Sequence, residues 1–357
     1  MSALIEDLGA LVESESPSSD PAACEACADV LAAVGERRLG VAPERVDAGG
    51  APAVVWRFGG PTRVLLVGHL DTVWPRGTLA ELPFRVEGDR ATGPGVFDMK
   101  AGLVQGIHAL ASLGEDLDSV TFLVTSDEET GSLGSRELIE SEARGALAAL
   151  VLEPSVDGAL KTARKGVSMY RLEVRGRAAH AGLEPEKGVN ALVELAHQVL
   201  ALQGIARPDI GTTVTPTVAT AGTTMNVVPE EASVQIDVRC STPDEQGRVD
   251  AAMRALRATL PGSSLVVHGA PNRPPMPASS SADLFARAQR LASFPLRGVE
   301  VGGGSDGNFT AGVGTPTLDG LGAVGDGAHA RHEWTDVSAM ASRIDLVAAL
   351  VRDLLRS

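Results

Sequence analysis

Side chains that bind divalent metals follow several apolar segments of this 357-residue sequence. His69 and Asp71 come after Val64–Gly68, whose run of aliphatic residues predicts a buried strand of a parallel sheet. Because side chains alternate in direction along a strand, the two side chains point the same way, and the carboxylate can orient an imidazole that binds metal. A core histidine beside a turn aspartate is the simpler explanation while this motif stands alone.

Three further carboxylates lie at the ends of predicted elements. Asp98 follows a loop rich in Gly and Pro and precedes a helix predicted over 100–113, and capping of that helix would by itself explain Asp98. The strand predicted over 120–125 leads into Glu128 and Glu129, two adjacent carboxylates whose repulsion favours a bound cation. A solvated loop is the alternative for this pair.

The apolar segments 146–152 and 316–321 repeat the pattern, with Glu153 after the first and His329 after the second. Five segments thus supply a mixed imidazole and carboxylate set, namely His69, Asp98, Glu129, Glu153 and His329. Such a set suits zinc or another borderline divalent ion, and with one bridging carboxylate it can hold two ions about 3.5–4 Å apart. Glu128 is left over, and a carboxylate that lies beside the metals without binding them is what a general base requires.

Composition restricts the partners and the location. At 357 residues, two domains are expected, and a net charge of -15 argues against nucleic acid or an anionic membrane as a partner. No apolar run approaches the roughly 18 residues of a membrane span, and the acidic start of the chain does not resemble a secretory signal, so we expect a cytoplasmic protein. The three cysteines, Cys24, Cys27 and Cys240, are interpreted as packing residues.

The order of the predicted elements indicates an α/β protein with an insertion. Helices are predicted over 2–14 and 20–38, and the strands 53–58 and 64–68 flank the turn Gly59–Pro61 as a hairpin-like pair. From 163 to 276 the predicted order becomes βαββαβ, which is ferredoxin-like. The strands and helices of this stretch are predicted over 166–175, 188–202, 214–221, 233–239, 243–260 and 265–268.

None of the five candidate ligands falls in this stretch, so residues 164–275 are interpreted as an inserted lid domain. Residues 1–163 and 276–357 then form the catalytic di-zinc domain, whose mixed and mostly parallel sheet is flanked by helices. An open four-stranded sheet needs cover for its edge, which supports pairing of two lids in a homodimer.

The sequence resembles the M20 family of co-catalytic zinc peptidases and amidohydrolases, and within it the glutamate carboxypeptidases of the G2 type. The motifs that carry the resemblance run nearly end to end and are Gly68–Asp71, Gly95–Gly102, Ser126–Ser132, Leu152–Pro154 and Gly327–His329 with Glu333. The resemblance implies a zinc exopeptidase-like fold in which His69 and Glu153 hold one zinc ion, Glu129 and His329 hold the other, and Asp98 bridges both. Cobalt or manganese could replace zinc.

The same resemblance implies that residues 164–275 are also the dimerisation domain, and it implies further roles. Asp71 would orient His69, Glu128 would be the base, and the Asp98–Met99 peptide bond would be cis. Met99 departs from the Asn or Asp that is frequent in the family, which affects no ligand.

Substrate contacts are also implied by the resemblance. Arg273 would bind the substrate α-carboxylate, and His180 would stabilise the oxyanion from the lid of the partner subunit. The other residues that similarity marks are Lys165, Asn226, Arg239, Gly304 and Ser305. Any one of the cationic side chains in this set could instead be merely solvated. The Gly-rich loop 302–308 lacks the nucleotide-binding patterns, so it is interpreted as a backbone approach to a substrate carboxylate.

The predicted activity is zinc-dependent hydrolysis of the amide bond before a C-terminal amino acid. Glutamate is the first candidate for that amino acid. The substrate would be a small molecule or short peptide with a free C-terminal carboxylate. An N-acyl amino acid deacylase of the acetylornithine or succinyl-diaminopimelate type is the alternative. A catalytically silent binding protein of the same fold would be expected to lack Glu128 or a ligand, and none is lacking.

Overall fold

The computed structural model describes residues 2–357, and the chain forms two compact units. The first unit contains the chain up to Arg164 together with Met276–Val301 and Ser305–Ser357. The second unit contains Lys165–Pro275 and the short segment Gly302–Gly304. The second unit therefore begins one residue after the start that the sequence predicted and adds a piece of the Gly-rich loop.

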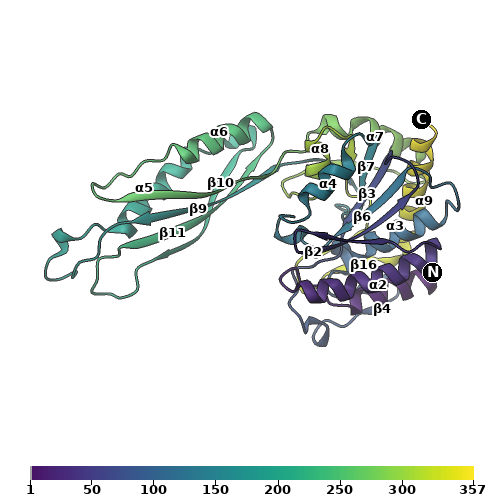
Figure 1. The fold of residues 1–357 in the computed structure, drawn as a ribbon, viewed down its shortest axis with the longest axis horizontal. Helices are drawn as coiled ribbons and strands as arrows, with labels where there is room; N and C mark the ends of the chain where they lie inside the picture. The colour runs from purple at the N-terminus through teal and green to yellow at the C-terminus, as the bar shows by residue number, and fades with distance from the viewer. Residues whose placement is uncertain (1) are drawn as a thin grey trace. The chain divides into compact units, whose positions relative to one another are not determined.

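A six-stranded sheet forms the centre of the first unit (Figure 1). Its strands, in spatial order, are β1 (Glu44–Ala48), β2 (Ala51–Phe58), β6 (Val120–Thr125), β3 (Val64–His69), β7 (Ala148–Val151) and β14 (Thr317–Leu318). The last four are parallel, whereas β2 is antiparallel to β6 and β1 is antiparallel to β2. Every residue of β3, β6 and β7 is buried, as the continuous aliphatic runs predicted.

The predicted pairing of β2 with β3 is wrong, because β6 lies between them. Val54 of β2 pairs with Val124 of β6, and Leu66 of β3 pairs with Phe122 of β6. β2 instead turns back on β1 through Gly49 and Gly50, whose φ angles of 65° and 92° favour glycine. The sequence suggested a hairpin because it shows which segments are strands and how short the turn is, but not which distant strand inserts.

Helices cover both faces of this sheet. Side chains alternate in direction along β2, β3 and β6, so successive residues of these strands contribute to two separate apolar cores on opposite faces of the sheet. The larger core packs against α1 (Ser2–Glu13), α2 (Pro21–Leu39), α3 (Ala101–Ala111), α7 (Ala278–Leu291) and α9 (Val337–Leu355). The smaller core packs against α4 (Arg136–Ala143) and α8 (Gly307–Gly312). The first unit therefore has the three layers expected of an α/β domain.

Short strands complete the first unit. They are β4 (Arg85–Glu87), β5 (Arg90–Thr92), β15 (Gly325–Asp326) and β16 (Trp334–Asp336) in one small sheet, and β8 (Leu160–Arg164) with β13 (Gly298–Val301) in another. No helix in residues 2–357 combines the length and the apolar character needed to cross a membrane.

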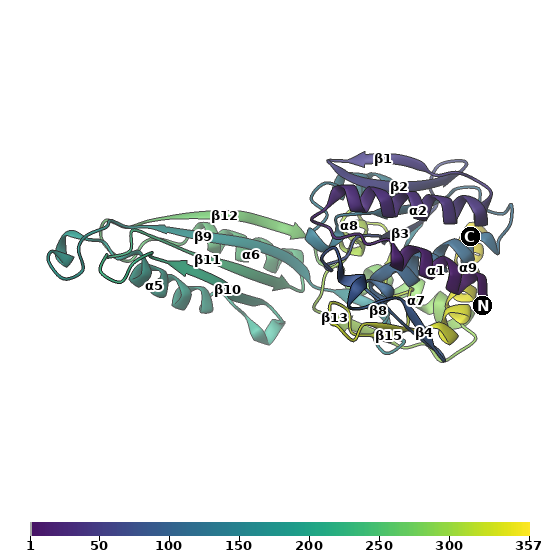
Figure 2. The same cartoon turned by 90° about the horizontal axis from the view of Figure 1, so that it is seen from below.

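The second unit has the predicted βαββαβ order (Figure 2). Its elements are β9 (Gly166–Arg175), α5 (Ala191–Gln203), β10 (Thr213–Ala221), β11 (Glu231–Cys240), α6 (Pro243–Arg254) and β12 (Ser264–Arg273). The strands form an antiparallel sheet in the order β10-β11-β9-β12, which is the ferredoxin-like order. Leu172 and Val174 of β9 belong to the core shared with α5 and α6, whereas Arg171 and Arg175 are exposed.

Candidate metal centre and active site

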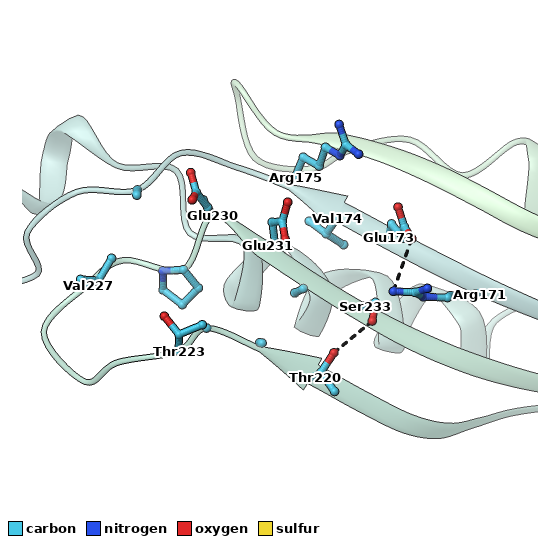
Figure 3. A pocket seen from close by; sticks show the side chains of 15 residues that line it. Arg171, Glu173, Val174, Arg175, Thr220, Thr223, Val227, Glu230, Glu231 and Ser233 are labelled. Carbon is cyan, nitrogen blue, oxygen red and sulfur yellow. Dashed lines mark hydrogen bonds and ion pairs between the residues drawn. The ribbon is translucent and has the colours of Figure 1, made fainter.

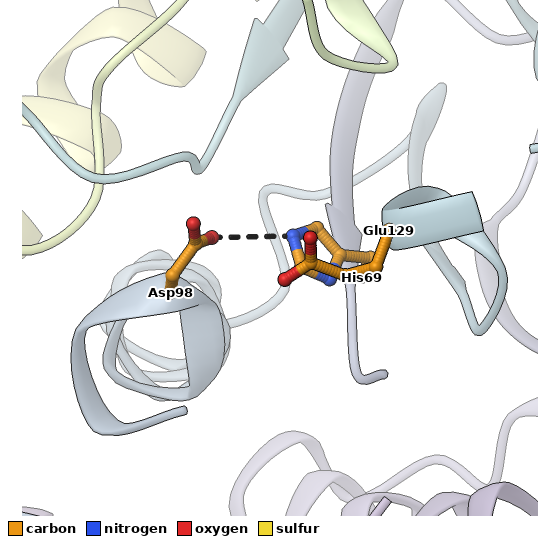
Figure 4. Close-up of side chains that lie close together, drawn as sticks. All are labelled: His69, Asp98 and Glu129. Carbon is orange, nitrogen blue, oxygen red and sulfur yellow. Dashed lines mark ion pairs between the residues drawn. The ribbon is translucent and has the colours of Figure 1, made fainter. Parts of the chain in front are cut away.

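The carboxyl ends of neighbouring parallel strands bring candidate ligands to one edge of the central sheet. His69 is the last residue of β3, Glu129 follows β6 in a short helical turn, and Glu153 follows β7. Asp98 comes from the turn Val96–Lys100 that leads into α3. Figure 4 shows the side chains of His69, Asp98 and Glu129 pointing toward one another from these elements.

Asp98 lies between the two histidines. Its Oδ1 is 3.3 Å from Nε2 of His69, and its Oδ2 is 3.6 Å from Nε2 of His329. Oε1 of Glu153 is 3.6 Å from Nε2 of His69, and Oε1 of Glu129 is 3.1 Å from Nε2 of His329. Two pairs of imidazole and carboxylate therefore share one carboxylate, which is the arrangement that a bridged two-ion site requires.

The donor atoms of this cluster fit a divalent metal ion. Ligand atoms of His69, Asp98 and Glu129 lie within 4.8 Å of one another, and so do those of His69, Glu128 and Glu153. Within the described residues, Nε2 of His69 and Oδ1 of Asp98 are buried without a hydrogen bond, although buried polar atoms normally have a partner. A cation coordinated by both atoms would satisfy them.

Electrostatics favour a cation at the same place. The hydrogen bond with Glu129 raises the pKa of His329 to about 9. Burial by itself lowers the pKa of His69, but its contacts with three carboxylates outweigh burial and raise the pKa well above the ordinary value. Burial raises the pKa of Glu129, and the neighbouring Asp98 adds to this effect. The cluster thus holds excess negative charge that metal ions can neutralise.

Glu153 differs from the other candidate ligands in its neighbours. Among the ion pairs of the described residues, it alone of these ligands pairs with a lysine and an arginine. Its Oε2 is 3.2 Å from Nη2 of Arg164 and 3.5 Å from Nζ of Lys161. Arg164 in turn donates from Nε to Oδ2 of Asp319 over 2.8 Å. Burial alone would raise the pKa of Glu153, but the two cations lower it well below the ordinary value. Glu153 is therefore held as a carboxylate, with Oε1 toward His69.

Asp71 connects the end of β3 to the turn after β6. Its Oδ1 is 3.4 Å from Nδ1 of His69, whose Nδ1 also lies 3.0 Å from the backbone oxygen of Asp71. The backbone N–H groups of Glu128 and Glu129 each donate to its carboxylate over 3.2 Å. Ser18 donates to the same carboxylate from its hydroxyl over 2.7 Å. Asp71 is thus placed to orient His69 and also fixes the backbone of the glutamate pair.

Glu333 holds the turn that carries Asp98. Its Oε1 accepts hydrogen bonds from the backbone N–H groups of Phe97 at 2.9 Å and Asp98 at 3.1 Å. Its Oε2 accepts from the backbone N–H of Gly95 at 2.9 Å and from Nε1 of Trp74 at 2.8 Å. The sequence marked Glu333 as part of a motif but assigned no role to it. The structure shows that it holds the backbone of Asp98.

Sequence reasoning found the candidate ligands but missed the residues that hold them. The Asp98–Met99 peptide bond is cis, as the resemblance implied. Ser18, Arg164 and Asp319 were not identified, because they meet their partners across long stretches of chain. Ser18 is 53 residues from Asp71, and Arg164 is 155 residues from Asp319. No spacing or periodicity in the sequence signals such pairs.

The predicted substrate residues fall mostly in the second unit, which contains Lys165, His180, Asn226, Arg239, Arg273 and Gly304. Arg273 of β12 is buried, and the loop 302–304 passes so close that a Cβ on Gly304 would lie 2.8 Å from Cδ of Arg273. A side chain at 304 would therefore force Arg273 or its neighbour Val167 to shift. Arg239 pairs with Asp237 through Nε and Nη2, each over 2.8 Å.

His180 is exposed, and its Nδ1 accepts hydrogen bonds from the backbone N–H groups of Gly182 and Leu183, both over 3.1 Å. A neutral imidazole in this position carries its proton on Nε2. Asn226 is also exposed, and its backbone oxygen accepts a hydrogen bond from the backbone N–H of Ala181 over 2.9 Å. The substrate roles of these residues stay predictions.

Two other predicted residues make contacts within their own units. Nζ of Lys165 donates to the backbone oxygen of Gly211 over 2.5 Å. Ser305 lies in the first unit, where its buried hydroxyl donates to Asp319 over 2.6 Å and accepts from the backbone N–H of Gly307 over 3.1 Å. The backbone of Ser305 is engaged as well, because its N–H donates to Oδ1 of Asn308 over 2.9 Å and its oxygen accepts from the backbone N–H of Asn308 over 3.0 Å.

A pocket of about 440 Å³ lies on the second unit, over β9, β10 and β11 (Figure 3). Its lining carries both charge signs and includes the ion pair of Arg171 with Glu173 at 3.4 Å. Thr220 and Ser233 share a hydrogen bond of 3.1 Å across it. None of the predicted site residues lines this pocket, so it is separate from the predicted chemistry.

Comparison with known proteins assigns the family. The profile of Peptidase family M20/M25/M40 matches residues 65–353. The chain belongs to this family. Over 312 residues it is 37% identical to carboxypeptidase G2 of Pseudomonas sp. (strain RS-16). The matched region covers 83% of this chain and 74% of that protein. This member of the M20 family is therefore an enzyme, a metallohydrolase of the metallopeptidase and amidohydrolase class.

Solved structures of the family share the fold. The M20 family metallo-carboxypeptidase Sso-CP2 of Sulfolobus solfataricus matches with a TM-score of 0.75 and 16% identity, over 99% of this chain and 98% of that one. The YXEP protein of Bacillus subtilis, a dinuclear metal-binding peptidase of the M20 family, matches with a TM-score of 0.65 and 16% identity, over 100% and 98%. At these identities the likeness concerns the fold alone.

Proposed function

We propose that this enzyme cleaves the amide bond before a C-terminal amino acid, with glutamate as the preferred residue. The observation that carries the proposal is the position of Asp98, which offers one oxygen to each of two pairs of histidine and glutamate, with Glu128 beside them. The 37% identity to carboxypeptidase G2 supports a carboxypeptidase rather than another hydrolase of the family.

Two zinc ions per subunit would be held by the clustered side chains. His69 and Glu153 would bind one ion, Glu129 and His329 the other, and Asp98 both. Nitrogen and oxygen donors in this mixture suit zinc, and cobalt or manganese could replace it. When bound, the ions supply Lewis acidity, which lowers the pKa of water and polarises the amide carbonyl.

The protein side chains would handle the proton and position the substrate. Glu128 would take a proton from the attacking water and give it to the nitrogen of the leaving amine. Asp71 fixes the backbone N–H groups of Glu128 and Glu129, so that the base keeps its place beside the ligands. Arg273 would bind the substrate α-carboxylate through two parallel hydrogen bonds. Lys165, Asn226, Arg239 and the loop at Gly304 and Ser305 would complete the substrate contacts.

A substrate panel tests this proposal. The zinc-reconstituted enzyme is assayed on N-acyl amino acids in which first the C-terminal residue and then the acyl group is varied. We expect kcat/KM to depend on the C-terminal residue and to fall sharply when the free carboxylate is amidated. Arg273→Lys should reproduce much of that loss, because a lysine cannot form the bidentate pair. Equal cleavage of amidated and free-acid substrates would rule out the carboxypeptidase function, and dependence on a short acetyl or succinyl group would indicate a deacylase.

We also propose that the second unit mediates a homodimer. Leu192, Val193 and Leu200 are exposed apolar residues of α5, and Val218 is exposed on β10, an edge strand that contacts α5. An edge strand with exposed apolar residues near it is a surface that another copy of the chain can cover. The partner subunit's His180 would then donate a hydrogen bond from Nε2 to the developing oxyanion.

Mixing two inactive variants tests the shared site. Subunits of His180→Ala and Glu128→Gln are allowed to exchange in equal amounts. Half of the dimers are then mixed, and each has one site with both groups intact, so recovery of about one quarter of wild-type activity is expected. Verified mixed dimers without activity would rule out donation of His180 across the interface.

A further inference from the structure

One arginine of α9 lies on the buried face of that helix. Arg343 is one turn from Met340 and one turn from Leu346, both of which are buried. Arg343 itself is only 2% exposed. A buried guanidinium without a carboxylate is strongly unfavourable, so its surroundings should contain a compensating group.

The protein contacts of Arg343 do not supply that compensation. Its Nη2 donates to the backbone oxygen of Gly158, and its Cζ lies 5.4 Å from the centre of the Phe294 ring. Its Nη1 is buried without a hydrogen-bond partner in the described part of the chain. Burial lowers the pKa of Arg343 to about 10, so the group remains a cation at neutral pH. One donor of a buried cation is thus left unmatched.

Arg343 lines a pocket of about 160 Å³ in the first unit together with a second cation, Arg297. Arg297 donates from Nη2 to the backbone oxygen of Asp157 over 3.2 Å, which holds it at the pocket. Asp157 is the one acidic residue among the described lining residues, and no ion pair joins it to either arginine there. A single water needs about 10–15 Å³ of such volume, so the pocket has room for a small ion.

We propose that this pocket binds a small inorganic oxyanion, sulfate or phosphate, between Arg343 and Arg297. A planar guanidinium pairs with the oxygens of such an ion through parallel hydrogen bonds, and Nη1 of Arg343 is a donor in need of an acceptor. Two positive charges face a single negative one in the lining, so an anion would complete the local balance.

The pocket adjoins two segments that carry candidate metal ligands. Gly158 follows Glu153 in the chain, and Val324 of the lining precedes His329. These segments are already joined, because Ser155 donates from its backbone N–H to the oxygen of Ala323 over 2.8 Å. A bound anion would add a further connection between them and stabilise the folded first unit.

Thermal unfolding of the zinc-loaded enzyme tests the proposal. Sodium sulfate is titrated against sodium chloride at matched ionic strength. For the wild type we expect a Tm that rises by about 1–3 °C more in sulfate and then saturates. Arg343→Met should abolish the sulfate-specific rise. Arg297→Gln, which changes an exposed residue, should shift the titration to roughly tenfold higher sulfate. Arg352→Gln, an exposed position on the same helix, is the matched control and should behave like the wild type.

Crystals soaked in selenate give the position of the ion. An anomalous peak between Arg343 and Arg297 supports the site, and its absence in Arg343→Met crystals supports it further. Superposed sulfate and chloride curves for the wild type would overturn the proposal. So would a crystal structure in which the carboxylate of Asp157 occupies the place of the anion.

Discussion

Glu333→Gln is expected to weaken both the fold and the metal centre. The carboxylate of Glu333 accepts four hydrogen bonds, two on each oxygen. Glutamine keeps the shape of the side chain but replaces one oxygen with an NH₂ group, so two buried N–H donors lose their acceptor. Each unsatisfied group costs about 1–3 kcal/mol, and the free energy of unfolding should therefore fall by about 2–6 kcal/mol before relaxation.

Metal binding should fall as well. One of the four donors is the backbone N–H of Asp98, the proposed bridging ligand, so this residue loses part of its support. Loss of a group that holds a ligand typically lowers metal affinity by about 10- to 100-fold, and we expect a loss of this size in Glu333→Gln. Competition with a chelator measures the zinc affinity, and urea denaturation of the loaded enzyme measures stability.

Glu87→Gln, which changes an exposed carboxylate of β4, is the control and should change neither quantity. If Glu333→Gln bound zinc within twofold of the wild type and unfolded at the same urea concentration, the role assigned to Glu333 would be refuted.

Three further predictions follow from particular contacts. Glu128→Gln should keep its zinc but lose a factor of about 10² to 10⁴ in kcat, whereas Glu129→Gln should lose metal first. Measuring metal content together with kcat distinguishes the two variants. Loss of metal from Glu128→Gln would instead make Glu128 a ligand. Asp7→Asn should destabilise the protein by about 1–3 kcal/mol, because buried Asp7 pairs with Arg37, Arg38 and His108. Burial by itself raises the pKa of Asp7, but these partners outweigh burial and lower it, so the stabilisation is present above the ordinary value of 3.8 and is lost as the pH falls below it. The stabilities of wild type and Asp7→Asn should therefore converge in acid, and a difference that persisted at low pH would contradict this. Gly102→Ala should cost about 1–3 kcal/mol or more, because the new Cβ would lie 2.1 Å from the backbone oxygen of Leu152, while Gly247→Ala meets open space in α6 and should stabilise by up to about 1 kcal/mol. Equal effects of the two glycine substitutions in urea denaturation would show that the close contact is absent.

The sequence predicted those features that depend on local patterns. Aliphatic runs indicated β3, β6 and β7, and the polar residues after them indicated His69, Glu129 and Glu153, because strand ends and their side chains are encoded together. α2 begins at Pro21, one residue after the predicted start, with Asp20 as its N-cap.

Features that depend on three-dimensional neighbours were not predictable in this way. β1 was missed because its exposed and charged residues give a weak strand signal, and β2 was paired with the wrong strand. The support of Asp71 by Ser18 and of Asp98 by Glu333 joins residues that are 53 and 235 positions apart. Only the folded chain shows these pairs.

The place of the second unit in the chain affects how the enzyme is made on the ribosome. β7 and β8 are synthesised before Lys165–Pro275, whereas their partners β14 and β13 are synthesised after it. Because β7 ends at Val151 and β14 begins at Thr317, the edge of β7 stays uncovered for roughly 8–33 s at about 5–20 residues per second.

During this interval the second unit has all of its strands and can fold, but the segment that carries His329 and Glu333 has not yet emerged. The nascent first unit therefore exposes an apolar strand edge and an incomplete set of metal ligands until almost the whole chain is translated. Chaperone binding to the nascent chain should be strongest in this window, and metal should be taken up only after it.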